Sequence, residues 1–404
     1  MMRRSNLFRA KPASGLKRAD DSAFSTAFSG GAMSSTTTSQ NESVDFVVDR
    51  NDLHRCQFVE APRAERFDAG HILLGVDAFA FTANNITYAV AGDMLSYWSF
   101  FPAAPGWGRI PVWGFADVLR SSHPRIAEGA RVFGYLPMST HFVVQADVRG
   151  SGGFSDAAAH RAGLPAIYNQ YVLTASDPGY ERTHEDQQML FRPLFMTAFL
   201  LDDFLADNGF FGARSIVLSS ASSKTAFGLA FLLSSRSREQ CEVVGLTSAA
   251  NRAFVEGLGC YHRVVTYDQI GTLPRAPVVF VDMAGDGALT SALHHHYGDA
   301  MKHSCIVGMT HWAQRAQPTD LPGPTPTFFF APTQLQKRTQ ELGAEGFQGL
   351  YRRVWREFVE FTRDRIRIVH ANGPAAVERV YRQTLDGHAR PAEGHVLSLR
   401  AAGA

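Results

Sequence analysis

The chain has 404 residues, enough for two domains of ordinary size. Its hydrophobic fraction of 45% and charged fraction of 19% are those of a globular protein, and a net charge of +1 creates no strong field for nucleic acid or an anionic membrane. A small-molecule substrate is therefore the expected partner. The cysteines show no spacing typical of a zinc site, which predicts a reducing compartment and no metal; they are Cys56, Cys241, Cys260 and Cys305.

Residues 1–43 differ from the rest in composition, because arginine and lysine stand there among many serines and threonines. A transit peptide has this composition, and so does a disordered extension ahead of a start at Met33. We leave both interpretations open and expect a cytoplasmic location, with a mitochondrial one as the alternative. The longest apolar run is interrupted by Asp202 and Asp203, which predicts a buried helix and no membrane span.

Residues 44–190 contain short alternating runs typical of strands, with turns between them and no long helix until the end of the segment. The expected strands are 44–50, 55–60, 71–82, 109–121, 130–138 and 140–146. This density predicts a partly closed all-β body.

Residues 191–330 alternate strands with helices, which predicts a doubly wound parallel sheet with helices on both faces. A helix at 186–208 precedes the first strand, Ser215 to Ser219. Further strands are expected at 241–248, 263–270, 276–285 and 304–312. Residues 331–404 return to the β style, with an amphipathic helix at 350–364 and strands at 365–371 and 394–400.

A turn of small residues follows the first strand of the parallel sheet. In such sheets ligands bind at the carboxyl ends of the strands, where helix N-termini present free N–H groups to phosphate. Serines and a lysine replace the usual GxGxxG fingerprint, and they supply hydroxyl groups and an ammonium for a diphosphate. The candidate cofactor-binding residues are Ser220, Ser222, Ser223, Lys224 and Thr225. The alternative is a scaffold whose cofactor site has been lost.

The second strand of this unit ends without the acid that binds the ribose 2′-hydroxyl of NAD. Thr247, Ser248 and Arg252 offer hydrogen bonds and a positive charge instead, which favours a 2′-phosphate and therefore NADPH. As the alternative, Arg252 is a solvated helix residue.

Five segments together resemble the quinone-oxidoreductase side of the medium-chain dehydrogenase/reductase superfamily, in a zinc-free branch classed as a domain of unknown function. They are HILLGVDAFAFTANNITYA, GARVFGYLPMSTHFVV, VVFVDMAGD, CIVGMTHW and GHVLSLR. The resemblance implies a GroES-like, partly open β-barrel domain formed by the first half and the last strands, with a Rossmann domain inserted between them. It also implies hydride transfer from the cofactor without zinc. The glycine-poor turn departs from the superfamily's pattern.

Three residues in the segment that borders the substrate by this resemblance are catalytic candidates: Asn84, Asn85 and Tyr88. The amides can orient a carbonyl as enolate charge develops, and Tyr88 can deliver a proton. Because asparagine also forms turns, a structural role is the alternative for Asn84 and Asn85.

Four residues are candidates for the substrate pocket: Trp98, Trp107, Tyr135 and His141. The tryptophans lie in or beside a loop rich in proline and glycine, and a histidine at the start of a strand is a residue type that can contact a ligand. Core packing is an equally open interpretation for Tyr135 and His141. The histidine run 294–296 is interpreted as a solvated helix face, because adjacent helix residues point in different directions.

The leading hypothesis is an NADPH-dependent, zinc-free reductase of an enone, quinone or related carbonyl compound. A non-redox ligand-binding protein and a cofactor-independent lyase or isomerase are the alternatives on the same two domains. Serine hydrolysis is set aside, because no GxSxG motif occurs and Asp282 suits the end of a strand. A homodimer through an edge strand of the cofactor sheet stays open.

Overall fold

The computed structural model describes residues 42–62, 67–236, 242–307 and 320–401. The interpretations of residues 1–41 and of Cys241 fall outside these ranges. In the part of the chain that is described, no helix is long and apolar enough to cross a membrane.

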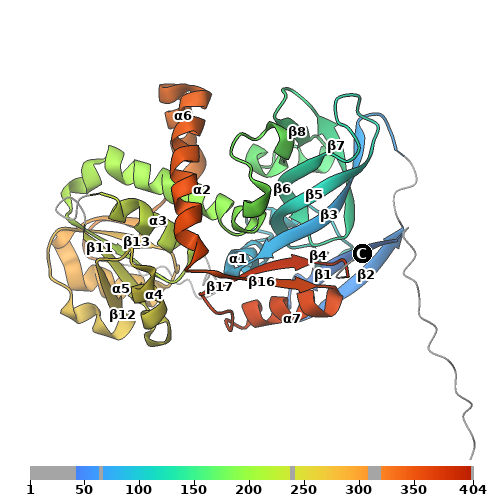
Figure 1. The fold of residues 1–404 in the computed structure, drawn as a ribbon. Coiled ribbons are helices and arrows are strands. Elements are labelled where there is room, and N and C mark those ends of the chain that lie inside the picture. The colour runs from blue at the N-terminus through green and yellow to red at the C-terminus, as the bar shows by residue number, and fades with distance from the viewer. Residues whose placement is uncertain (1–41, 63–66, 237–241, 308–319, 402–404) are drawn as a thin grey trace, which may run out of the picture. The chain divides into compact units, whose positions relative to one another are not determined.

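An eight-stranded sheet forms most of the β domain (Figure 1). Its order is β16-β17-β3-β5-β6-β9-β8-β7, and a further pairing of β3 with β7 closes part of it as a barrel. The strands are β3 (His71–Phe81), β5 (Pro111–Ser121), β6 (Arg131–Pro137), β7 (His141–Asp147), β8 (Gly153–Asp156), β9 (Gln170–Leu173), β16 (Arg367–Asn372) and β17 (Glu393–Ser398). The predicted GroES-like, partly open β-barrel is confirmed, and β16 and β17 join it beside β3.

A smaller antiparallel sheet completes this domain. It consists of β1 (Glu42–Asp49), β2 (Cys56–Pro62) and β4 (Trp107–Gly108). The four-residue strands β8 and β9 were not predicted, and β8 follows a stretch rich in glycine and serine.

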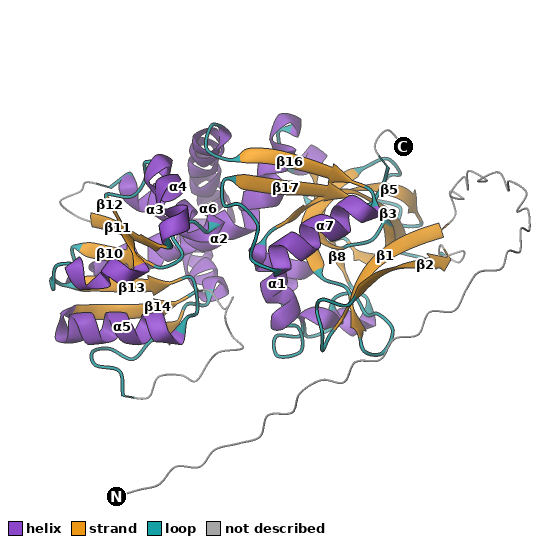
Figure 2. Ribbon diagram, turned by 90° about the horizontal axis from the view of Figure 1, so that it is seen from below, coloured by secondary structure: helices purple, strands orange, loops and turns teal. Residues whose placement is uncertain are grey.

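Six parallel strands form the second sheet, in the order β12-β11-β10-β13-β14-β15 (Figure 2). They are β10 (Ser215–Leu218), β11 (Glu242–Thr247), β12 (Arg263–Thr266), β13 (Val278–Asp282), β14 (Met301–Ile306) and β15 (Thr327–Phe328). The order reverses at β10 and β13, the arrangement of a Rossmann sheet. The predicted doubly wound sheet is therefore confirmed.

Alternate residues of β10 pack on opposite faces of this sheet. Ile216 and Leu218 belong to a core shared with α2 (Glu185–Asp207), α3 (Lys224–Ser234) and α6 (Ala331–Arg363). Val217 belongs to a second core with α5 (Gly287–Tyr297). Both faces are therefore covered by helices, as the continuous apolar strands predict.

Helix α6 is much longer than the predicted 350–364 segment. It bends at Gly343, whose φ of 70° and ψ of 162° are not helical. Beyond the bend, aromatic residues spaced by three or four positions pack in the core with α2; they are Phe347, Tyr351, Trp355 and Phe358. The remaining helices are α1 (Ala83–Val90), α4 (Arg252–Leu258) and α7 (Pro374–Leu385).

Candidate functional site

The turn between β10 and α3 follows a tight path without glycine. Ser220 has a φ of 48°, in the left-handed region, which costs a residue with a Cβ roughly 1–2 kcal/mol. Ser223 caps α3, its Oγ accepting the Ala226 N–H at 3.3 Å. A Cβ on Gly245 of β11 would lie 2.9 Å from the Cβ of Ala221, so this glycine allows the turn to approach the second strand.

Tyrosines from the two ends of β12 hold the backbone of this turn. The Tyr267 hydroxyl accepts the Ser220 N–H at 3.2 Å. The Tyr261 hydroxyl donates to the Ala221 carbonyl at 2.8 Å. The strained conformation at Ser220 is therefore fixed by its surroundings, and these two tyrosines were not predicted as site residues.

Backbone donors are still open at the N-terminus of α3. Within the described ranges, the N–H groups of Ser222, Lys224 and Thr225 donate to no acceptor. The Asn251 amide donates to Ser222 Oγ at 3.3 Å, which joins this turn to the one after β11. The predicted cofactor-binding residues of the two turns thus lie at one edge of the sheet.

Lys224 faces the β domain. Its Nζ donates to the carbonyl of Glu393, the first residue of β17, at 3.0 Å. Burial lowers the pKa of Lys224 to about 8. The ammonium therefore stands at the N-terminus of α3 but is bonded to a strand of the other domain in this conformation.

The turn after β11 carries the expected basic residue. Thr247 is buried at the end of the strand, and Ser248 precedes a short helical turn, Ala249–Asn251. Arg252 begins α4 and pairs with Glu256 one turn later, Nε to Oε1 at 2.8 Å. Both partners of this pair are exposed, so the pair adds little stability and leaves the guanidinium accessible to a ligand.

A buried carboxylate fixes the end of the neighbouring strand β13. Asp282 accepts the Ser219 hydroxyl at 2.8 Å and the N–H groups of Ala284 and Gly285 at 3.0 Å each. Thr290 of α5 donates to its second oxygen at 3.3 Å. Asp282 therefore ties two strand ends and a helix together, consistent with its interpretation as the end of a strand.

The three catalytic candidates lie on α1, a helix that was not predicted from the sequence. The Asn85 side chain completes a capping box with Thr82 and donates to the Pro111 carbonyl at 3.0 Å, so its amide is committed to the fold. Tyr88 is buried, and burial raises its pKa well above the ordinary value. The Asn84 amide and the Trp113 indole lie beside the Tyr88 hydroxyl and oppose that rise. Tyr88 therefore keeps its proton at neutral pH.

Tyr88 belongs to a group of four packed tyrosines, which we call the tyrosine cluster: Tyr88, Tyr97, Tyr135 and Tyr168. Burial raises the pKa of each phenol. Among the described residues, the buried Tyr135 hydroxyl has no hydrogen-bond partner. One buried donor is thus uncommitted beside Tyr88.

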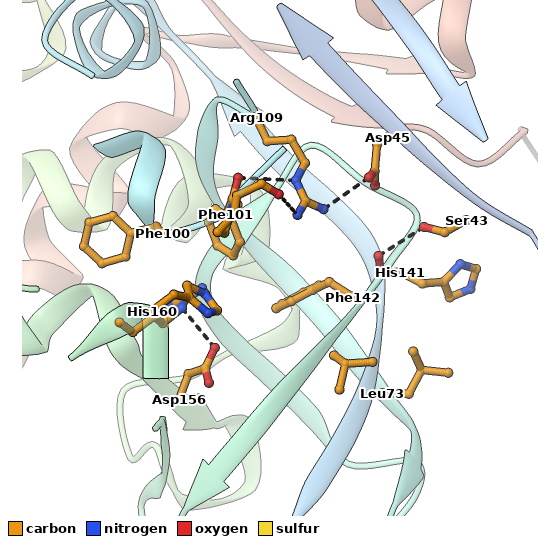
Figure 3. A pocket seen from close by; sticks show the side chains of 13 residues that line it. Ser43, Asp45, Leu73, Phe100, Phe101, Arg109, His141, Phe142, Asp156 and His160 are labelled. Carbon is orange, nitrogen blue, oxygen red and sulfur yellow. Dashed lines mark hydrogen bonds and ion pairs between the residues drawn. The ribbon is translucent and has the colours of Figure 1, made fainter. Parts of the chain in front are cut away.

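The four candidates for the substrate pocket are not gathered in one place. Trp98 is buried against Gly92 and Gly108, and Trp107 lies in β4. Tyr135 packs on Phe100, which lines a cavity in the β domain, and His141 lines the same cavity (Figure 3). Within the described residues, no three histidine, cysteine or acidic side chains are placed to hold a metal ion.

Residues 79–390 match the model of a family described as a protein of unknown function, DUF2855. The chain belongs to this family. No curated protein matches the sequence.

Among solved structures, this DUF2855 protein is similar to CurA from Vibrio vulnificus in complex with NADPH, at 10% identity and a TM-score of 0.53, over 89% of this chain and 99% of that one. It is also similar to a mutant form of enoyl thioester reductase from Candida tropicalis, at 11% identity and a TM-score of 0.52, over 88% of this chain and 99% of that one. Both proteins share the fold of this chain, and this is the fold that the resemblance in the sequence implies.

Proposed function

We propose that this DUF2855 protein is an NADPH-dependent, zinc-free reductase of an enone, quinone or related carbonyl compound. The observation that carries the proposal is the joined pair of turns at the carboxyl edge of the parallel sheet. There, open N–H groups at the N-terminus of α3 lie next to the turn that carries Arg252, linked through Asn251 and Ser222. Such an edge suits a ligand with two separated phosphate groups.

The residues of this edge fit a dinucleotide phosphate. The hydroxyl groups of Ser220 and Ser222 and the N–H groups of α3 would bind the diphosphate, and Arg252 would pair with the 2′-phosphate. Lys224 would add a positive charge after exchanging its bond to the Glu393 carbonyl for a phosphate oxygen. The NADPH complex of CurA, a protein of the same fold, supports this assignment.

Bound NADPH supplies the hydride in this proposal, and the chain supplies orientation and a proton. Tyr88 holds its proton at neutral pH because burial raises its pKa. Asn84, beside the Tyr88 hydroxyl, would orient the substrate carbonyl while the phenol protonates the enolate. A phenol with a raised pKa gives up its proton only to a strong base, which an enolate is.

Titration with NADPH and with NADH, followed by nicotinamide fluorescence, tests the proposal. We expect micromolar binding of NADPH, a loss of at least tenfold in Lys224→Ala, and a similar loss in Arg252→Ala that is absent for NADH. Arg263→Ala is the matched control, because Arg263 also forms an exposed ion pair, with Glu242 at 3.1 Å, but lies at the start of β12 on the opposite edge. Absence of NADPH binding in the unaltered protein would overturn the proposal.

A non-redox ligand-binding protein is the second candidate function. One observation favours it: the Ser220 N–H and the Lys224 ammonium already have partners within the chain, Tyr267 and the Glu393 carbonyl. This candidate predicts that neither nucleotide binds and that Lys224→Ala leaves every ligand affinity unchanged.

A further inference from the structure

A cavity of about 230 Å³ lies within the β domain (Figure 3). Its lining residues all fall between Ser43 and Arg161, so none belongs to the parallel sheet or to the turns at its edge. A molecule in this cavity would make contacts that require no nucleotide.

The walls of the cavity are largely apolar and aromatic. Leu73, Phe100, Phe101 and Phe142 line it, and Figure 3 shows the rings of Phe101 and Phe142 on two of its sides. A dry cavity of about 150 Å³ with such a lining can hold benzene. The space here is therefore large enough for a six-membered ring that carries a small polar group.

Arg109 contributes hydrogen-bond donors at the cavity wall. Its Nε and Nη2 donate to the carbonyls of Phe101 and Pro102, at 3.4 and 2.5 Å, and its Nη1 donates to Asp45 Oδ2 at 3.2 Å. A guanidinium has five N–H donors, so these three bonds leave donors over. The bonds also hold the arginine rigidly against the wall, which preorganises it for an acceptor.

Arg161 is a second guanidinium of the lining, and its side chain is only 2% exposed. It lies 3.0 Å from Asp156 Oδ2 and over the Phe101 ring at 4.6 Å. Its Nε nevertheless has no hydrogen-bond partner of good geometry among the described residues.

The two arginines of the lining repel each other. Burial is the main cause that lowers the pKa of Arg109, and the charge of Arg161 lowers this pKa further, whereas the carboxylate of Asp45 raises it.

The lining holds two arginines and two aspartates, and the spare N–H donors of Arg109 favour an anion over a cation. Asp45 and Asp156 each have an arginine partner, and Asp156 also accepts two backbone N–H groups, whereas Oδ1 of Asp45 has no hydrogen-bond partner among the described residues. His141 and His160 add two imidazole side chains to the lining. A carboxylate placed here would accept hydrogen bonds from the remaining N–H groups of Arg109. Its negative charge would also reduce the repulsion between the two guanidinium groups.

We propose that this cavity is a binding site for a small organic carboxylate with an aromatic or compact apolar body, separate from the cofactor edge of the parallel sheet. The apolar walls hold the body of the ligand, and Arg109 with Arg161 holds its carboxylate.

Isothermal titration of the full chain with benzoate, benzamide and benzylamine tests this site, since the three molecules share a ring and differ in charge. We expect benzoate to bind at least tenfold more tightly than the other two, and its binding to persist in Lys224→Ala and with NADPH present. Failure of NADPH to bind would leave this result unchanged, so the two proposals fail separately. Equal binding of benzoate and benzamide, or tighter binding of benzylamine, would overturn the site.

Val143→Trp and its control Leu350→Trp locate the binding site without altering the buried ion pair of Arg161 with Asp156. Val143 lines the cavity and is 37% exposed, so Val143→Trp fills the space from its rim and should abolish benzoate binding. Leu350→Trp on α6 is the matched control at 38% exposure and should leave it unchanged. Arg109→Gln should weaken the binding of benzoate at least tenfold and the binding of benzamide by less than threefold. Unaltered benzoate binding in folded Val143→Trp, checked by circular dichroism, would contradict the proposal.

Discussion

The carboxyl edge of the parallel sheet and the tyrosine cluster of the β domain differ in whether their buried polar groups have hydrogen-bond partners. At the sheet edge, Asp282 accepts four hydrogen bonds and the Ser219 hydroxyl takes part in three. In the tyrosine cluster, the buried Tyr135 hydroxyl has no partner among the described residues. The difference separates a strand end whose buried polar groups are all hydrogen-bonded from a region that leaves a buried donor without a partner.

The largest effect on stability should come from removing the Asp282 carboxylate, which accepts the hydrogen bonds at the end of β13. Asp282→Ala leaves a hydroxyl and backbone N–H groups buried without an acceptor, and we expect a loss of about 3 kcal/mol in the free energy of unfolding. Urea unfolding measures it. Asp286→Ala, which removes only the cap of α5, should cost about 1 kcal/mol. Equal losses of stability in Asp282→Ala and Asp286→Ala would contradict the larger structural role given to Asp282.

A smaller effect of opposite sign is expected at Lys224. Its pKa is about 8 in the fold against an ordinary value of 10.5, so below pH 8 the folded chain carries the full penalty of burying the charge. Between pH 8 and 10.5 the unfolded chain holds more protons, and the free energy of unfolding rises with pH. Lys224→Met should therefore stabilise the chain at pH 7 by about 1–2 kcal/mol and flatten this rise of the free energy of unfolding with pH. The same substitution should weaken the binding of NADPH.

Thermal unfolding at pH 7 and pH 10 measures the change at Lys224. Lys302→Met is the control, because the exposed Lys302 also donates from Nζ to a backbone carbonyl. Its stability should change by less than about 0.5 kcal/mol at either pH. If Lys224→Met destabilises the chain at pH 7, the bond to Glu393 outweighs the burial of the charge.

The smallest effects compare two phenols in the β domain. Tyr135→Phe removes a hydroxyl without a partner and should change the free energy of unfolding by less than about 0.5 kcal/mol. Tyr171→Phe removes a hydroxyl that donates to the Tyr135 carbonyl at 3.0 Å and should cost about 1–2 kcal/mol. A loss in Tyr135→Phe as large as that in Tyr171→Phe would mean that the Tyr135 hydroxyl has a structural partner after all.

The sequence predicts those parts of the fold that depend on local patterning. The apolar strand at Ser215 and the helix before it are confirmed because continuous apolar runs and helical periodicity specify buried elements directly. Helix α1 was missed, since a capping box between Thr82 and Asn85 fixes eight residues that also suit a turn. The first part of α6 was missed because Gly343 interrupts its pattern.

The candidate site was predictable only where one turn supplies it. Ser220 to Thr225 could be chosen from their place after a buried strand, and the structure places them at the end of β10. The roles of Tyr261 and Tyr267 depend on the pairing of β12 with β11, which brings their hydroxyls to that turn. The cavity combines β1, β3, β7, β8, the segment 100–109 and the helical turn Ala159–Arg161, and spacing along the sequence gives no signal for such a combination.

The pairing of β17 with β3 has a consequence for how the chain is made. His395 lies opposite Phe81, so a ribosome adds almost the whole chain after β3 before β17 can cover that edge. An edge that waits unpaired is open to another nascent chain, and contacts so distant in sequence form slowly. Shortened chains that stop before Glu393 should therefore aggregate, and a separately supplied segment containing β16 to β17 should rescue them.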